Sequence, residues 1–173
     1  MIQFEDENEV LATVGASAGR RLLGLVPLGL LGILLIYIAF VRPPELVWQA
    51  FLILVGGAAM WIADAMRRAT ANVVELTPKG LRDSDGTVIA AFDDIQGMDR
   101  GFFAFKPSNG FLLKLRAGAQ TNGAWRPGLW WRTGRRSGVG GMTPSNQTKF
   151  MADILSTMMA EREAAADQDG TLR

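Results

Sequence analysis

The chain has 173 residues, of which 49% are hydrophobic and 20% are charged, and its formal net charge is +1. It contains no cysteine and no histidine. This excludes disulfide bonds and thiolate metal sites, and it removes the commonest general base and the commonest metal ligand. Chemistry carried by carboxylates alone remains open, but no clustered set of them stands out. We therefore expect a non-enzymatic protein without a cofactor or a bound metal.

Residues 1–19 combine an acidic start with a small, mildly apolar stretch. We expect this segment to be a frayed or interfacial cytoplasmic lead-in. Gly15 and Gly19 form a Gly-x-x-x-Gly pair, a pattern that brings membrane helices close together. The pair lies outside the charge-free run that follows, which favours a flexible lead-in over a helix contact.

Two long uncharged runs follow, residues 22–41 and 46–63, and a short turn at residues 42–45 joins them. At about 1.5 Å per residue, helices over these runs would be roughly 30 Å and 27 Å long, close to the thickness of a bilayer's hydrocarbon core. We therefore predict a transmembrane helical hairpin over residues 20–68.

Basic residues at the ends of the runs predict the orientation of the hairpin. Arg20 and Arg21 precede the first run and Arg67 and Arg68 follow the second, whereas the connecting turn carries only Arg42. Because short basic flanks stay in the cytoplasm, we expect both termini to be cytoplasmic and the connecting turn to be periplasmic or its equivalent. A twin-arginine export signal is the alternative, but the first run is too long for a signal core and a second span follows at once.

The second run also carries small residues and one acid at its end. Gly56, Ala59 and Ala63 fall on one helix face, where we expect the first helix or a partner's helix to pack. Asp64 stands three and four residues before a pair of arginines, which predicts local ion pairs along the helix. A proton or ion role for Asp64 would require a deeper position in the membrane.

From residue 72 onward the pattern changes to short strands separated by turns. The predicted strands are residues 72–77, 80–82, 87–92, 96–103, 111–116, 129–133 and 137–141. Thr143 and Pro144 then suit the start of an amphipathic helix. Its apolar face would comprise Phe150, Met151, Ile154, Leu155, Met158 and Met159. We expect this helix to fade within residues 161–166, which leaves residues 164–173 as a disordered tail.

Three segments carry a resemblance to a known family. These are Leu-Thr-Pro-Lys-Gly-Leu at residues 76–81, Phe-Asp-Asp-Ile at residues 92–95, and residues 138–141 leading into the last helix. Over residues 72–163 the chain resembles the bacterial pleckstrin-homology-like (PH-like) membrane proteins. The resemblance implies an α+β membrane protein, in which a transmembrane hairpin precedes a bent, barrel-like antiparallel sheet capped by a C-terminal helix. It implies a binding or scaffolding module, with no catalytic residues to carry over.

A basic region is the main candidate for binding, because residues 100–152 contain no acid. The resemblance implies that strand loops could contact anionic lipid head groups or a partner. The candidate residues are Lys106, Arg126, Trp130, Trp131, Arg132, Arg135 and Arg136. The alternative is a solvated basic face with the tryptophans, including Trp125, in the core. Nucleic acid is disfavoured as a partner because the predicted anchor is a membrane hairpin and the net charge is near zero.

These observations predict a non-catalytic accessory, assembly or regulatory subunit of a membrane complex. Its expected partners are membrane lipids and either a complex partner or a second copy of the chain. The alternative is a membrane enzyme or transporter component that uses Asp64, Asp93 and Asp94. Asp83 and Asp85, with the Asp93–Asp94 pair, lack the spacing of a calcium loop, which favours a role in turns. A third possibility is a cytoplasmic part that only stabilises oligomers.

Overall fold

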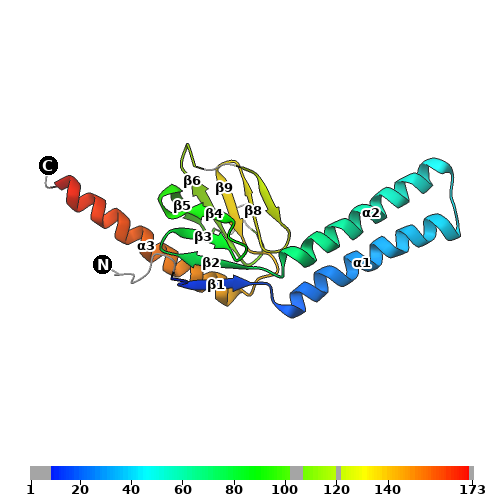
Figure 1. Ribbon diagram of the computed structural model, residues 1–173, viewed down its shortest axis with the longest axis horizontal. Helices are drawn as coiled ribbons and strands as arrows, with labels where there is room; N and C mark the ends of the chain where they lie inside the picture. Colours follow the sequence, from blue (N-terminus) through cyan, green and yellow to red (C-terminus); the bar gives the residue numbers. More distant parts are fainter. Residues whose placement is uncertain (1–8, 102–106, 120–121, 172–173) are drawn as a thin grey trace.

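The computed structural model describes residues 9–101, 107–119 and 122–171. A helical hairpin extends from one end of an α+β domain (Figure 1). Its helices are α1 (Ala18–Val41) and α2 (Leu46–Ala69). Both are long and apolar enough to cross a membrane, as the sequence predicted.

Glycines let α1 and α2 pack closely. A Cβ atom at Gly32 would lie 2.9 Å from the carbonyl oxygen of Gly56, and one at Gly56 would lie 3.0 Å from the oxygen of Gly32. Gly56 and Ala59 are buried in the hairpin, while Ala63, nearer the domain, is half-buried. The helix contact therefore lies on the face of α2 that carries the predicted small residues.

The described part of the segment before α1 contains a strand at residues 12–15, which corrects the expectation of a frayed lead-in there. Strand β1 (Ala12–Gly15) pairs antiparallel with β2 (Val73–Thr77), the strand that follows α2. Ala12 and Val14 alternate into the core and are buried, which explains why the segment is ordered. The hairpin is thus inserted between two paired strands, and the domain begins before the first helix as well as after the second.

The nine strands of the described residues form two antiparallel sheets, ordered β1-β2-β3-β4 and β5-β6-β9-β8-β7. The strands not yet given are β3 (Gly80–Asp83), β4 (Val88–Ala91), β5 (Ile95–Asp99), β6 (Phe111–Leu115), β7 (Ala124–Arg126), β8 (Trp130–Thr133) and β9 (Arg136–Val139). A short 3₁₀ turn, η1 (Phe92–Asp94), connects the sheets. Strand β7 lies in a stretch expected to be a loop. The described strands do not close into a single barrel.

Helix α3 (Ser145–Thr171) covers the sheets and then extends beyond them, away from the hairpin (Figure 1). Met151, Leu155 and Met158 enter the core, as the periodicity predicted, whereas Phe150 is exposed. The helix continues to Thr171 instead of fading within residues 161–166, which corrects the expected disordered tail. Alanine, glutamate and arginine dominate residues 160–166, and their high helix propensity accounts for the extension.

Candidate membrane-interface site

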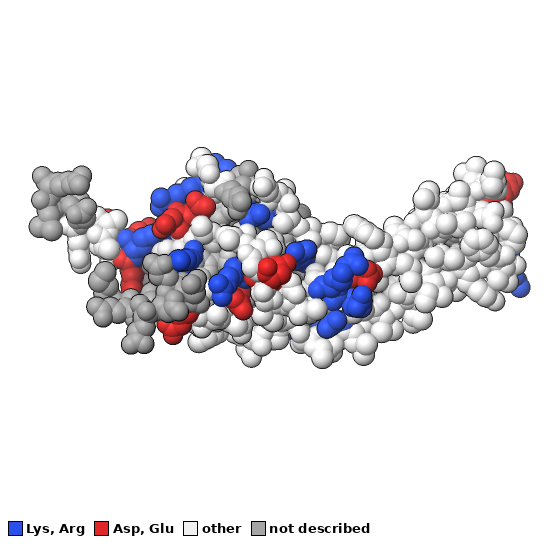
Figure 2. All heavy atoms as spheres, in the orientation of Figure 1, with Lys and Arg blue, Asp and Glu red and all other residues white. Residues whose placement is uncertain are grey.

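The basic ends of the hairpin lie where it joins the domain. Arg20 and Arg21 are near the start of α1, and Arg67 and Arg68 lie in the last turn of α2. Figure 2 shows basic side chains gathered at this boundary, beside a long uncharged hairpin surface with charges again at its far tip. The boundary is therefore the place where a charge-free surface meets a polar domain.

Backbone and side-chain hydrogen bonds join the start of α1 to the segment before α3. The N–H of Ser17 donates to the carbonyl of Met142 at 3.0 Å, and Arg20 Nη1 donates to the carbonyl of Thr143 at 3.0 Å. Together with the β1–β2 pairing, these bonds fix the direction in which the hairpin leaves the domain.

Two methionines fill the joint between the hairpin and the domain. Met142 and Met66 both lie against Gly24 of α1 and against Gly128 in the β7–β8 turn. A Cβ atom at Gly24 would lie 2.5 Å from the Met142 methyl group, and one at Gly128 would lie 3.0 Å from Met142 Cγ. The two glycines leave space for flexible thioether side chains, which suit irregular gaps of this kind.

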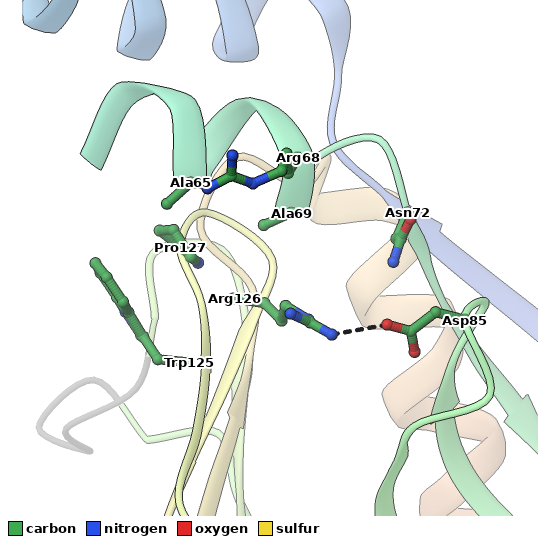
Figure 3. Close-up of a pocket in the computed structure, with 8 residues that line it drawn as sticks. All are labelled: Ala65, Arg68, Ala69, Asn72, Asp85, Trp125, Arg126 and Pro127. Atoms are coloured by element: carbon green, nitrogen blue, oxygen red, sulfur yellow. Dashed lines mark hydrogen bonds and ion pairs between the residues drawn. The ribbon is translucent and has the colours of Figure 1, made fainter. Parts of the chain in front are cut away.

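A cavity of about 330 Å³ opens beside this joint, between the end of α2 and the sheet (Figure 3). One wall comes from the last turns of α2 and the residues after it. The other comes from β7, the proline that follows it, and the β3–β4 turn. The lining residues are Ala65, Arg68, Ala69, Asn72, Asp85, Trp125, Arg126 and Pro127.

Carboxylates of the β3–β4 hairpin hold Arg126. Its Nη2 lies 2.7 Å from Asp85 Oδ2, and its Nε lies 3.7 Å from Asp83 Oδ2. Hydrogen bonds from Thr87, from both its side chain and its backbone, together with the Arg126 guanidinium hold the pKa of Asp85 below its ordinary value. Asp85 therefore remains a carboxylate at neutral pH and keeps Arg126 at the floor of the cavity.

Arg68 approaches the cavity from α2. It forms an ion pair with Asp64, which also binds Arg67 at 2.9 Å, so one carboxylate is shared by two guanidinium groups. These are the local helix pairs that the sequence predicted for Asp64. The side chains of Arg67 and Arg68 are about 60% exposed, which leaves guanidinium N–H groups facing outward.

Two tryptophans lie beside the cavity, and one of them, Trp125, lines it. The rings of Trp61 on α2 and Trp125 on β7 have centroids 6.3 Å apart, and both side chains are largely exposed. Exposed tryptophan pairs are unusual on a soluble surface, whereas tryptophan is enriched at the interface between lipid and water. The pair lies between the uncharged hairpin surface and the arginines.

Two of the predicted binding residues are structural instead. Trp130 is 1% exposed, and its Nε1 donates to Asp83 Oδ2 at 2.8 Å. Arg132 is 6% exposed and donates to the backbone carbonyls of Asn122, Val88 and Ile89. Arg132 therefore links the free edge of β4 to the second sheet, and neither residue is available for contact with a lipid or a partner.

The other predicted residues are dispersed. Trp131 is half-buried across Gly138 on the neighbouring strand. Arg135 and Arg136 are exposed at the β8–β9 turn, and Arg135 Nε donates to the Leu115 carbonyl. Lys106 lies outside the described residues. Of the predicted residues that the structure describes, only Arg126 lines the cavity.

Sequence reasoning did not assign Asn72 and Asp85 to a site, and it assigned the end of α2 only to membrane anchoring. Arg68 carried a usable signal, since it was expected at the cytoplasmic end of the second membrane span. The opposite wall of the cavity carried no such signal in the sequence, because only the fold brings β7 and the β3–β4 turn to α2.

The three carboxylates of the alternative site, Asp64, Asp93 and Asp94, come from two different elements. Asp64 belongs to α2 and is held by its two arginines, whereas Asp93 and Asp94 lie in η1 between the sheets. Neither Asp93 nor Asp94 lines the cavity beside α2. Among residues 9–101, 107–119 and 122–171, no group of three or more acidic side chains is placed to hold a metal ion.

Comparisons with protein-family models, with curated protein sequences and with solved structures gave no significant match.

Proposed function

We propose that this chain is a non-catalytic integral protein of the bacterial inner membrane, in which α1 and α2 span the bilayer and both termini are cytoplasmic. The observation that carries the proposal is the distribution of exposed apolar side chains. Apart from Val10, Val88, Trp125 and Phe150, every exposed large hydrophobic residue of the described chain lies on the hairpin. Each such side chain gains roughly 1.5–3 kcal/mol when it leaves water, so a bilayer is the natural surrounding of this surface.

The low burial of α1 and α2 also argues against their being core helices of a soluble protein. A core helix is largely covered by its own protein, whereas only 11% of the most apolar window of each helix is buried. Arginines at the domain end and a nearly neutral tip agree with a hairpin whose tip is translocated. Orientation and membrane type are part of the proposal.

We propose that the cytoplasmic part is a PH-like binding domain, acting as an accessory, assembly or regulatory subunit. Support comes from the element order, with two antiparallel sheets covered by a C-terminal helix. Further support comes from the packed joint at Met66 and Met142, which would keep one face of the domain at the membrane surface. The bound species would be a partner protein or an anionic lipid of the inner leaflet.

Purification from native membranes in a mild detergent tests this function. The tagged full chain, with an unrelated two-span protein as the control, would be crosslinked and analysed by mass spectrometry for both proteins and lipids. We expect a reproducible partner or an enrichment of anionic lipid. Recovery as a lone monomer without lipid preference would contradict the proposal.

A further inference from the structure

We propose that the cavity between α2 and the β7–β8 turn binds the head group of an anionic phospholipid from the cytoplasmic leaflet. The inference rests on the proposed membrane-spanning role of the hairpin and names the ligand of its interface. In this arrangement Arg68 and Arg126 contact the phosphate, and Trp61 and Trp125 contact the glycerol and the first part of the acyl chains.

The height of the cavity along α2 suits a head group. Trp61 and Arg68 are seven residues apart, which is about 10 Å along a helix axis. With Trp61 at the hydrocarbon boundary, Arg68 lies among or just beyond the phosphates, since the head-group layer on each side is roughly 5–8 Å thick. The cavity volume of about 330 Å³ is at the small end of the range for ligand pockets, and it fits a head group better than a whole lipid.

The charge around the cavity favours an anion. The lining carries two arginines, Arg68 and Arg126, and one carboxylate, that of Asp85. Arg20, Arg21 and Arg67 add positive charge at the hairpin ends outside the lining, where Asp64 pairs with Arg67 and Arg68. Figure 3 shows the Arg68 side chain along α2 above Pro127, while Arg126 below points toward Asp85. Arginine presents several N–H groups in a planar fork that matches phosphate, so donors remain after each ion pair.

The neighbouring polar groups position these arginines. Asp85 fixes Arg126 from one side. Asn72 contributes an amide to the opposite wall, which is formed by the end of α2 and the residues after it, and amides can donate to phosphate oxygens. Trp125 lines the cavity and lies against Trp61 of the hairpin, so acyl chains would emerge on this side. The cavity thus offers a polar floor and an apolar exit, the polarity order of a phospholipid.

Arg67 and Arg68 give a matched pair for the test. They are adjacent, similarly exposed, and both paired with Asp64, but only Arg68 lines the cavity. Arg68→Gln and Arg67→Gln therefore remove the same charge from the same surface. Full-length protein would be placed in nanodiscs containing phosphatidylglycerol in phosphatidylcholine. Native mass spectrometry and lipid exchange would then measure the retained lipid.

We expect the wild type to retain phosphatidylglycerol over phosphatidylcholine, with Arg68→Gln weakening retention about tenfold, as for loss of a charge-assisted hydrogen bond. Arg67→Gln should stay within about twofold, since it loses only general surface attraction. Trp125→Leu, at an exposed position, should also weaken retention while the fold is kept. Soluble glycerol phosphate at millimolar concentration should not displace the lipid.

Equal effects of the two arginine substitutions would overturn the proposal, because they would show general attraction to an anionic surface. Absence of a preference for phosphatidylglycerol in the wild type would overturn it as well. Displacement by soluble glycerol phosphate would assign the cavity to a soluble phosphate compound instead. Membrane insertion and recovery of a protein partner are measured in separate experiments. A negative result for lipid binding in the cavity is therefore distinguishable from a negative result for the proposed function.

Discussion

The hairpin and the α+β domain use similar apolar side chains in opposite ways. In the domain, leucine, isoleucine and methionine side chains from both sheets and α3 meet in one buried core. In the hairpin, helix contact buries mainly Gly32, Gly56 and small neighbours, while leucines, isoleucines and aromatic rings point outward. The difference shows that burial of apolar side chains within the chain stabilises the domain. The hairpin, in contrast, depends on what surrounds its exposed apolar side chains.

The arginines of the two regions also differ in the direction of their side chains. Arg132 and Arg162 turn into the domain, where each donates to backbone carbonyls between the two sheets. Arg162 also lies over the ring of Phe92, with its guanidinium carbon 4.9 Å from the ring centre. Arg67 and Arg68 turn outward at the end of the hairpin. Inward arginines should therefore affect folding, and outward arginines should affect contacts with the surroundings.

The largest expected effect comes from Arg132→Leu, which removes the link between β4 and the second sheet. The carbonyls of Asn122, Val88 and Ile89 lose their donor, so we expect a loss of about 3 kcal/mol in the free energy of unfolding. Urea denaturation of the full chain in mild detergent, followed by circular dichroism, measures it. Arg136→Leu is the control at an exposed position and should change stability by less than about 0.5 kcal/mol. Equal effects of the two substitutions would refute the division of arginines.

The next effect concerns the buried carboxylate of Asp83. Its Oδ2 accepts from Trp130, while its Oδ1 has no hydrogen-bond partner among the described residues. Trp130→Phe removes the indole donor but keeps an aromatic ring, so we expect a loss of about 2 kcal/mol. Trp125→Phe, measured in the same denaturation experiment, should be nearly neutral because that ring is exposed. An unchanged free energy of unfolding for Trp130→Phe would contradict a structural role for the hydrogen bond between Trp130 and Asp83.

A smaller effect tests the packing of the hairpin. Gly56→Leu would place a side chain against Gly32 and Ile36, and we expect it to cost about 1 kcal/mol by forcing the helices apart. Gly57→Leu is the matched control, since nothing lies within 4 Å of a Cβ atom there. Thermal unfolding in detergent, read by size-exclusion chromatography, compares them. A larger loss for Gly57→Leu would indicate that the other face of α2 is the packed one.

The smallest effect is that of Asp85→Asn, which breaks the exposed pair with Arg126 and should cost about 0.5 kcal/mol at neutral pH. Because the pKa of Asp85 is lowered in the folded state, its contribution is present above the ordinary carboxyl pKa. It is lost as the pH falls through the lowered folded value. The stability difference between wild type and Asp85→Asn should therefore be constant from pH 7 to about pH 5 and vanish in stronger acid. A difference that grows on acidification would contradict this sign.

Sequence reasoning predicted the elements that depend on local pattern. The two uncharged runs, the strands around Leu113 and the apolar face of α3 follow from composition and periodicity. It missed β1, because the pairing of β1 with β2 spans the whole hairpin and a four-residue strand has no periodicity to recognise. The strand predicted over residues 96–103 ends at Asp99, and its last two residues, 102–103, lie outside the described part of the chain.

The candidate site was harder to predict for a related reason. The side-chain types of Trp130 and Arg132 suit binding and burial equally well, and only the buried Asp83 and the free β4 edge decide between them. Arg126 stood in the predicted set, but its cavity depends on the approach of α2 to β7. Contacts between residues about sixty positions apart leave no mark in the sequence around either one.

The absence of cysteine from the chain allows a direct test of membrane insertion. Single cysteines, Pro43→Cys at the hairpin tip and Glu163→Cys on the exposed part of α3, would be treated with a membrane-impermeant maleimide in intact spheroplasts and after permeabilisation. The account predicts labelling at position 43 in intact spheroplasts and at position 163 only after permeabilisation. Labelling of both positions, labelling in the reverse order, or release of the protein from membranes by alkaline carbonate would contradict it.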